Sequence, residues 1–295
     1  MGRLVVNADD FGLTPGVNRA IMELHAAGLV TSTSLMACAG ATAEAIEFAR
    51  TTPSLGVGCH IVLVDGEPIL PPEKIPSLVD ARTGRFPRSL TSFLLKLFTG
   101  RIRAAEIEAE AAAQIAQLQQ RGVQLTHIDT HKHAHIFSAV LRPVLRAARA
   151  AGIRTVRHPF EPEWAVRAAI GASLARVVQI AALRPLAPRS RQIIAQEGFM
   201  TTDGTIAMAG TGTLNAASLR SLLTQLPAGT WELVTHPGYN DADLARVRTR
   251  LRASRDVERL ALAAIPEIPG IEFISFAGLG TSASAAPTAT DLLTR

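Results

Sequence analysis

The sequence predicts a single α/β domain in which about seven strands form a barrel, and three observations support this. The chain has 295 residues, a length typical of one α/β barrel. Short apolar runs alternate with helix-like segments, which is the pattern of parallel strands joined by crossover helices. Polar residues suited to chemistry follow several of these runs, as they do at the carboxyl ends of barrel strands.

The first part of the chain shows this alternation most clearly. Residues 4–6 (Leu-Val-Val) predict a buried strand that ends in acidic residues. Thr14–Leu29 predicts a helix, because Thr14 is a suitable N-cap, Pro15 fits the first helical position and Gly28 fits the end. The next expected elements are a strand, a helix and a strand: Thr33–Ala37, Ala41–Thr51 and Val57–Val64.

The rest of the chain predicts a long helix, Ala104–Gln120, and four further strands: Leu125–Thr130, Thr155–Arg157, Trp231–Thr235 and Phe273–Phe276. Two insertions interrupt the pattern. Residues 65–100 are Pro-rich and become amphipathic over 90–98, and residues 162–192 are rich in Ala and Arg. We therefore expect one barrel domain over residues 1–280 and a disordered Ser/Thr/Ala-rich tail over 281–295.

The composition favours a basic protein of the cytoplasm. The net charge is +5, and Lys occurs only at three positions, so Arg supplies most of the positive charge. This charge either marks an anionic partner, such as a membrane surface, or reflects only an Arg-rich coding bias. We expect no nucleic-acid partner, because the arginines are dispersed and aromatic residues make up 4%. The N-terminus does not resemble a signal peptide, and no apolar run is long enough to span a membrane.

Three groups of polar residues follow short apolar, strand-like runs. They are Asp9-Asp10, His60, and the segment 129–135 with the sequence DTHKHAH. Alone, the acid pair is also typical of a turn, and one histidine is also typical of a protein core. The alternation of His131, His133 and His135 would place them on one face of a strand, and several imidazoles on one face are typical of a metal site.

A carboxylate and two imidazoles form a ligand set that suits Zn²⁺, with Mg²⁺ or another divalent ion as the alternative. The pattern predicts one such ion per chain, with open positions for water or substrate. The ion would lower the pKa of water, and a second acid would accept the proton. Asp9 and Asp10 are adjacent, so one serves as ligand and the other as base only if the strand ends or bends there.

A fourth feature is the segment 235–239, Thr-His-Pro-Gly-Tyr, which follows the predicted strand Trp231–Thr235. Its simplest interpretation is a Pro-Gly turn that carries a histidine by chance. The functional alternative makes His236 a general acid that protonates a departing amine.

Taken together, four motifs resemble those of the YdjC-like carbohydrate deacetylases: NADDFG, GVGCHIVL, IDTHKHAH and THPGY, in this order over residues 3 to about 278. The resemblance implies a deformed TIM-like (β/α) barrel and metal-dependent removal of an acetyl group from an acetylated amino sugar.

Matched by position, the resemblance implies Asp10, His60 and His131 as metal ligands. It implies Asp9 as general base and His236 as general acid. A further group is expected behind the ligands or facing the substrate: Asp129, His133, His135 and Arg157.

The sequence is most similar to the hopanoid-associated branch of this family, through RHPFEPEW, the Arg/Ala-rich segment 165–191 and QEGFMTTDG. That similarity implies an N-acetylglucosaminyl hopanoid as substrate and contact with the anionic inner face of the cell membrane. The alternative is a soluble chito-oligosaccharide, with the segments 90–98 and 162–192 serving only to pack on the barrel. The sequence leaves the oligomeric state open, with a homodimer as one alternative.

Two other function classes remain as alternatives. A metal-dependent phosphoesterase would need a binuclear site, and few spare acids lie near the histidines. A non-catalytic lipid-binding protein would need neither Asp9 nor His236.

Overall fold

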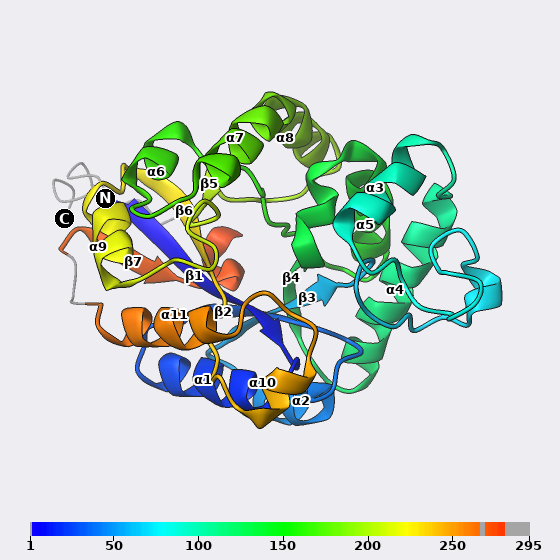
Figure 1. The fold of residues 1–295 in the computed structure, drawn as a ribbon, viewed down its shortest axis with the longest axis horizontal. Helices are drawn as coiled ribbons and strands as arrows, with labels where there is room; N and C mark the ends of the chain where they lie inside the picture. The colour runs from blue at the N-terminus through cyan, green and yellow to red at the C-terminus, as the bar shows by residue number, and fades with distance from the viewer. Residues whose placement is uncertain (1, 266–268, 281–295) are drawn as a thin grey trace, which may run out of the picture.

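The structure, a computed structural model, describes residues 2–265 and 269–280, and the predicted tail at 281–295 lies outside the described residues. Seven strands form one parallel sheet that is curled into a barrel-like shape (Figure 1). Their order is β4-β3-β2-β1-β6-β5, and β7 pairs with β1. The predicted α/β fold of about seven strands is therefore confirmed. The strands are β1 (Gly2–Phe11), β2 (Ser32–Leu35), β3 (Gly56–Ile61), β4 (Leu125–Thr130), β5 (Gly204–Ile206), β6 (Gly229–Thr235) and β7 (Ile271–Ile274).

Helices surround the sheet on its outer side (Figure 1). The α-helices are α1 (Pro15–Ala26), α2 (Thr42–Thr51), α3 (Leu90–Phe98), α4 (Ala104–Gln120), α5 (Ser138–Ala150), α6 (Glu163–Ala168), α7 (Leu174–Leu183), α8 (Ala187–Gln196), α9 (Ala216–Thr224), α10 (Ala242–Arg246) and α11 (Ala253–Ala263). The 3-10 helices are η1 (Pro72–Lys74), η2 (His131–Ile136), η3 (Arg184–Leu186) and η4 (Phe276–Gly280). None of the helices in the described part of the chain is long and apolar enough to cross a membrane.

Strand β1 lies at the centre of the sheet. It is buried along nearly its whole length and pairs in parallel with β2, β6 and β7. The apolar residues Leu4, Val6 and Ala8 are fully buried and belong to one continuous core that extends from β1 to α11. Because all the strands are parallel, their carboxyl ends meet at one edge of the sheet, and Asp9 and Asp10 lie at that edge.

The predicted strand Thr155–Arg157 is the main error in the fold prediction. This segment forms only isolated bridges, from Val156 to Ile128 of β4 and from Thr155 to Met200. Its backbone still bonds to both sides, since Ile128 N donates to Thr155 O and Val156 N donates to Met200 O. The segment therefore joins β4 to the chain that leads into β5, and it places Arg157 inside the barrel. Strand β5 was not predicted, because three residues with one large apolar side chain give no strand pattern.

Several local signals gave correct elements. The predicted bounds of α4 and β4 match the observed ones, and the hydroxyl of Thr14 accepts from Val17 N as the expected N-cap of α1. The insertion over 65–100 contains η1 and α3, and the one over 162–192 contains α6, α7, η3 and the first part of α8.

Candidate metal centre

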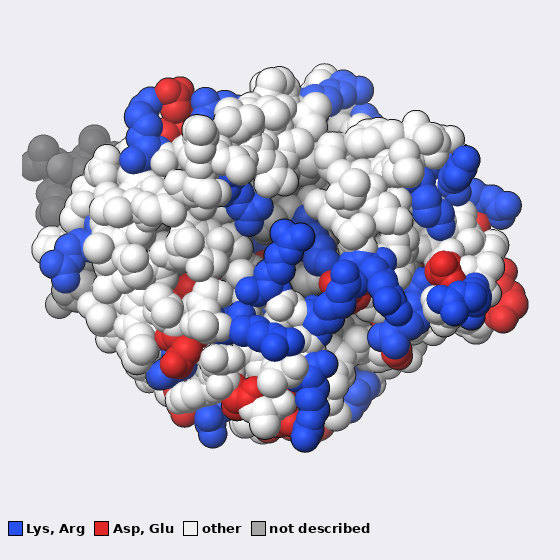
Figure 2. Space-filling view, in the orientation of Figure 1, with Lys and Arg blue, Asp and Glu red and all other residues white. Residues whose placement is uncertain are grey.

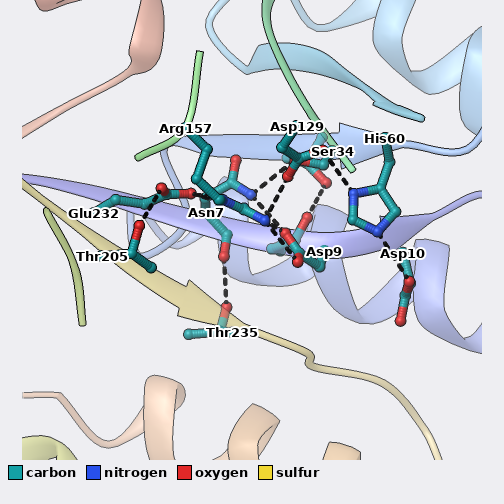
Figure 3. A network of polar contacts seen from close by, with 12 residues as sticks. Asn7, Asp9, Asp10, Ser34, His60, Asp129, Arg157, Thr205, Glu232 and Thr235 are labelled. Carbon is teal, nitrogen blue, oxygen red and sulfur yellow. Dashed lines mark hydrogen bonds and ion pairs between the residues drawn. The ribbon is translucent and has the colours of Figure 1, made fainter. Parts of the chain in front are cut away.

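The centre begins with a bend in β1. The pairing of β1 with β2 shifts register between Ala8 and Phe11, and Asp10 has a left-handed backbone with φ of 65°. An L-residue adopts this conformation rarely, and such positions gather at functional sites. Because of this bend, the side chains of Asp9 and Asp10 both lie at the same edge of the sheet (Figure 3). In a regular strand, two adjacent side chains would point to opposite faces.

Asp10, His60 and His131 meet at this edge. The distances are 3.2 Å from Asp10 Oδ1 to His131 Nδ1, 3.5 Å from Asp10 Oδ1 to His60 Nε2, and 3.2 Å between the two ring nitrogens. In a tetrahedral site with bonds of about 2.0–2.1 Å, the ligand atoms lie about 3.3–3.4 Å apart. Asp10 Oδ1 is buried without a hydrogen-bond partner. The three residues thus fit a divalent cation, and the His131 side chain, 20% exposed, forms the open side.

Asp129 fixes the orientation of His60. His60 Nδ1 donates to Asp129 Oδ1 over 2.7 Å, which directs Nε2 toward Asp10 (Figure 3). The same Nε2 faces Nδ1 of His131. A carboxylate behind a histidine is the usual support of a metal-binding imidazole. Burial alone would lower the pKa of His60, but the carboxylates of Asp129 and Asp9 outweigh it and raise the pKa to about 9. The surroundings of His60 therefore favour positive charge, as a ligand position of a cation should.

The carboxylate of Asp10 is also held from its other side. Its Oδ2 accepts from the buried guanidinium of Arg255. Burial favours protonation of Asp10, but Arg255 and then His131 outweigh this and keep the pKa well below its usual range. Asp10 is therefore ionised, with one oxygen on Arg255 and the other directed at the two imidazoles.

Arg157 lies in the middle of the buried network of hydrogen bonds and ion pairs behind the centre (Figure 3). Its guanidinium donates to both oxygens of Asp9, over 2.6 and 2.9 Å, and to Glu232 over 2.7 Å, and it pairs with Asp129 at 2.5 Å. Burial raises the pKa of Asp9, but Arg157 outweighs this and the pKa stays below its usual value. Arg157 thus bonds to three carboxylates, and its side chain is fully buried.

The histidine run does not form a strand, and its expected alternation on one face is wrong. Strand β4 ends at Thr130, and the chain then enters η2, where Lys132 and His133 have φ of 57° and 52°. This turn separates the three histidines. His135 bonds to Thr130 Oγ1 over 2.7 Å and to Arg157 O over 3.2 Å, so it holds the turn in place.

His131 is the member of the run that joins Asp10 and His60. His133 lies outside that group, and its Nδ1 is buried without a hydrogen-bond partner. Burial lowers the pKa of His133 well below its usual value, so its ring is neutral.

His236 lies beside Asp9, just after the end of β6. Its Nε2 is 3.8 Å from Asp9 Oδ2, and its Nδ1 is 3.8 Å from Glu258 Oε2. Its backbone N–H donates to the same Glu258 oxygen over 2.7 Å. The expected base and acid are therefore neighbours, next to the three possible ligands.

Sequence reasoning missed Arg255 and Glu258, which reach the centre from α11. A signal was available, because these residues occupy the stripe that continues with Ala261 and Leu262 on the buried face of that helix. A charged pair in the apolar stripe of an amphipathic helix needs buried partners, and here the partners are Asp10 and His236. Glu232, which accepts a hydrogen bond from Arg157, was missed as well.

A second group of possible ligands, Asp9, His60 and Asp129, lies next to the first and shares His60 with it. The guanidinium of Arg157 already binds both of its carboxylates. The geometry therefore favours one cation in the first group over a binuclear site.

A curled parallel sheet with buried carboxylates and imidazoles at its carboxyl edge defines the class of α/β-barrel enzymes. Within that class, the chain belongs to the YdjC-like protein family, whose model matches residues 3–265. The family resemblance drawn from the four motifs is thus confirmed.

Relatives agree with this assignment. The chain is 32% identical to a carbohydrate deacetylase of Thermoanaerobacter pseudethanolicus over 262 residues, which cover 89% of this chain and 91% of that one. It is also 32% identical to a carbohydrate deacetylase of Mus musculus, over 80% of this chain and 78% of the relative. A solved structure from Enterococcus faecalis V583, provisionally named a cellobiose-phosphate cleavage protein, is similar with a TM-score of 0.72 and 26% identity, and the match covers 94% of this chain and 98% of that one.

Proposed function

We propose that this protein is a metal-dependent carbohydrate deacetylase that hydrolyses the acetamide of an N-acetylated amino sugar. The observation that carries the proposal is the triangle of Asp10, His60 and His131 with Asp9 and His236 beside it. The relatives named carbohydrate deacetylase support the reaction class. The proposed cation is Zn²⁺, because one carboxylate and two imidazoles at these separations suit it.

When bound by Asp10, His60 and His131, the cation supplies Lewis-acid chemistry: it polarises a carbonyl and lowers the pKa of water. Asp10 supplies one negative charge to this position, and Asp129 keeps the ring of His60 in the orientation required for binding. The partly exposed His131 places the open side of the centre toward solvent.

Asp9 acts as the proton acceptor. Its pKa lies below the usual value, so the carboxylate is ionised when substrate arrives. Arg157 fixes the plane of the carboxylate, and the remaining lone pairs accept the proton of the attacking water. His236 then donates a proton to the amine nitrogen as the C–N bond breaks, which yields acetate and a free amino sugar.

The substrate we propose is an N-acetylglucosaminyl lipid of the hopanoid type, met by a cytoplasmic enzyme at the membrane surface. Exposed apolar side chains on two helices support an apolar aglycone: Leu95 and Phe98 on α3, and Leu174 and Val178 on α7. A soluble chito-oligosaccharide is the alternative. Mass spectrometry of both compounds after incubation with metal-loaded protein decides between them, through the loss of one acetyl group.

The test of the mechanism is a pair of variants. Asp9→Asn should lower kcat by about two to four orders of magnitude, because it removes the proton acceptor, and it should leave the metal content near that of the wild type. His131→Ala should lose both metal and activity. Acetate release and elemental analysis are the two measurements. Near wild-type turnover of Asp9→Asn would show that Asp9 is not the base.

A further inference from the structure

A pocket of about 870 Å³ lies between the segment that precedes α3 and the loop that follows α10. Six basic and two acidic residues line it: Arg82, Arg85, Arg88, Lys96, Arg246, Arg248, Asp65 and Asp80. Figure 2 shows Lys and Arg side chains gathered on this face of the molecule, around the hollow at its centre. The wall of the pocket therefore has a large excess of positive charge.

The frame of the pocket is well ordered by backbone bonds. Phe86 N donates to Gly66 O, and Asp65 N donates to Pro87 O, so two segments of the insertion are tied together. Phe86 is buried and anchors this part of the wall. Arg248 connects the opposite wall, because its guanidinium donates to Arg88 O over 3.2 Å.

Both acids of the pocket are already engaged. Asp80 Oδ1 accepts from the backbone N–H groups of Arg82 and Thr83 within its own turn, both over 3.0 Å. Asp65 pairs with Lys132 at 2.8 Å and with Arg248 at 3.4 Å. Asp80 still offsets part of the charge of Arg82 and Lys96, but two carboxylates against six cations leave the wall with an excess of positive charge.

Three cations of the wall have no carboxylate at ion-pair distance in the described part of the chain. Arg85 and Arg246 pair with acids outside the pocket, Glu67 and Asp243. Within residues 2–265 and 269–280, Arg82, Arg88 and Lys96 form no ion pair. Two guanidinium groups and an ammonium group that border one pocket match an anion with several oxygens.

The pocket is next to the proposed centre. Asp65 of its wall binds the ammonium group of Lys132, and Lys132 directly follows His131 in the chain. Through this ion pair one wall residue of the pocket is bonded to the turn η2, which carries His131.

We infer that this pocket is a second binding site, which takes a phosphate-type anion. The site goes beyond the proposed function, because neither the glucosaminyl lipid nor the chito-oligosaccharide proposed as substrate carries a phosphate. The same chemistry fits a phosphate on a soluble ligand and a phosphate in a lipid headgroup.

The experiment compares two double variants of the metal-loaded full chain that remove the same charge. Arg82→Ser with Arg88→Ser removes two unpaired cations of the pocket. Arg189→Ser with Arg220→Ser removes two exposed arginines from α8 and α9, outside the pocket wall. Inorganic phosphate is titrated by calorimetry, and vesicles of phosphatidylglycerol are co-sedimented, with phosphatidylcholine vesicles as the neutral reference.

The pocket variant should weaken binding of phosphate, of anionic vesicles, or of both by about tenfold or more, and the control should stay near the wild type. If the pocket variant loses affinity for inorganic phosphate, the ligand is a soluble anion. If it loses affinity for anionic vesicles alone, the ligand is a lipid headgroup. No binding by the wild type, or equal loss in both double variants, overturns the site.

Acetate release by the wild type from a neutral chito-oligosaccharide reports on the proposed function separately. If the wild type releases acetate but binds no anion, only the proposed anion site is wrong. If it binds the anion but releases no acetate from any acetylated sugar, only the proposed deacetylase activity is wrong.

Discussion

Arg157 sets the charge balance of the centre. One fully buried guanidinium serves Asp9, Asp129 and Glu232, and buried carboxylates without such a partner are costly. Burial raises the pKa of Glu232 to about 7, although Arg157 opposes the rise. The other two carboxylates stay ionised. Arg157 therefore keeps Asp9, the proposed base, ionised, and it keeps Asp129 ionised as the partner of His60.

Glu161 makes the stability of the fold depend on pH. The side chain is buried: Oε2 accepts from Ala209 N over 2.6 Å, and Oε1 has no hydrogen-bond partner. Burial raises its pKa from the ordinary 4.5 to about 7. Between these values the folded chain keeps a proton that the unfolded chain has lost. The contribution of Glu161 to stability is therefore largest below pH 4.5 and is lost as the pH rises to 7.

Glu161→Gln should remove this pH dependence, because the amide does not titrate. The unfolding free energy of the variant relative to the wild type should rise between pH 4.5 and 8 by an amount on the order of 3 kcal/mol. Urea unfolding of both proteins at several pH values measures it. Glu73→Gln, at an exposed position, is the control and should show a flat difference. A flat difference for Glu161→Gln as well would contradict the assigned pKa.

Helix α11 supports the centre from outside the sheet. Arg255 and Glu258 lie one turn apart on its buried face and contact Asp10 and His236. One helix thus positions both a proposed ligand and the proposed acid. Groups behind metal ligands commonly contribute 10–100-fold to metal affinity or activity.

Arg255→Met should therefore weaken metal binding about 10–100-fold, because Asp10 loses the partner that fixes its carboxylate. Competition with a chromophoric chelator gives the metal affinity. Arg259→Met, on the same helix, is the control, since Arg259 contacts Asp256 and the Tyr239 ring instead of the centre. If the two variants bind metal equally well, α11 has no positioning role.

The sequence predicted some elements correctly and others not. Elements that depend on local interactions were predicted, and elements that depend on contacts distant in sequence were not. Helix α4 and strand β4 follow from local periodicity, and their predicted bounds are the observed ones. The segment 155–157 depends on bonds to chain neighbours on both sides, and local pattern cannot distinguish such a segment from a strand. The turn η2 depends on left-handed residues that carry no Gly or Asn signal.

The same distinction holds for the site. Asp9, Asp10, His60, His131 and His236 could be predicted because each lies at or just after the carboxyl end of a strand, and these strand ends meet in this fold. Whether His131 or His133 joins Asp10 required the course of η2. Arg255 and Glu258 reach the centre from a helix, where proximity depends on packing between elements distant in sequence.

At the scale of the whole molecule, we expect the proposed cation to be needed for chemistry and not for folding. The core is one continuous apolar cluster that includes residues from β1, β3, α4, α5 and α11. A chain of this length buries enough surface to fold without a metal. The centre lies at the edge of that core, and hydrogen bonds to Arg157 and Arg255 hold its carboxylates in place.

Removal of the metal should therefore abolish acetate release and leave a folded chain. A ligand present at a hundredfold excess over its Kd stabilises the folded chain by about 3 kcal/mol. For a chain of this size, removal of the metal should therefore lower Tm by roughly 4–5 °C. Circular dichroism after chelation should keep its helical signal and a cooperative transition. Titration should restore activity with one equivalent, because Arg157 occupies Asp9 and Asp129 of the neighbouring group. Unfolding on chelation, or a need for two equivalents, would contradict a single cation held at the edge of a self-sufficient core.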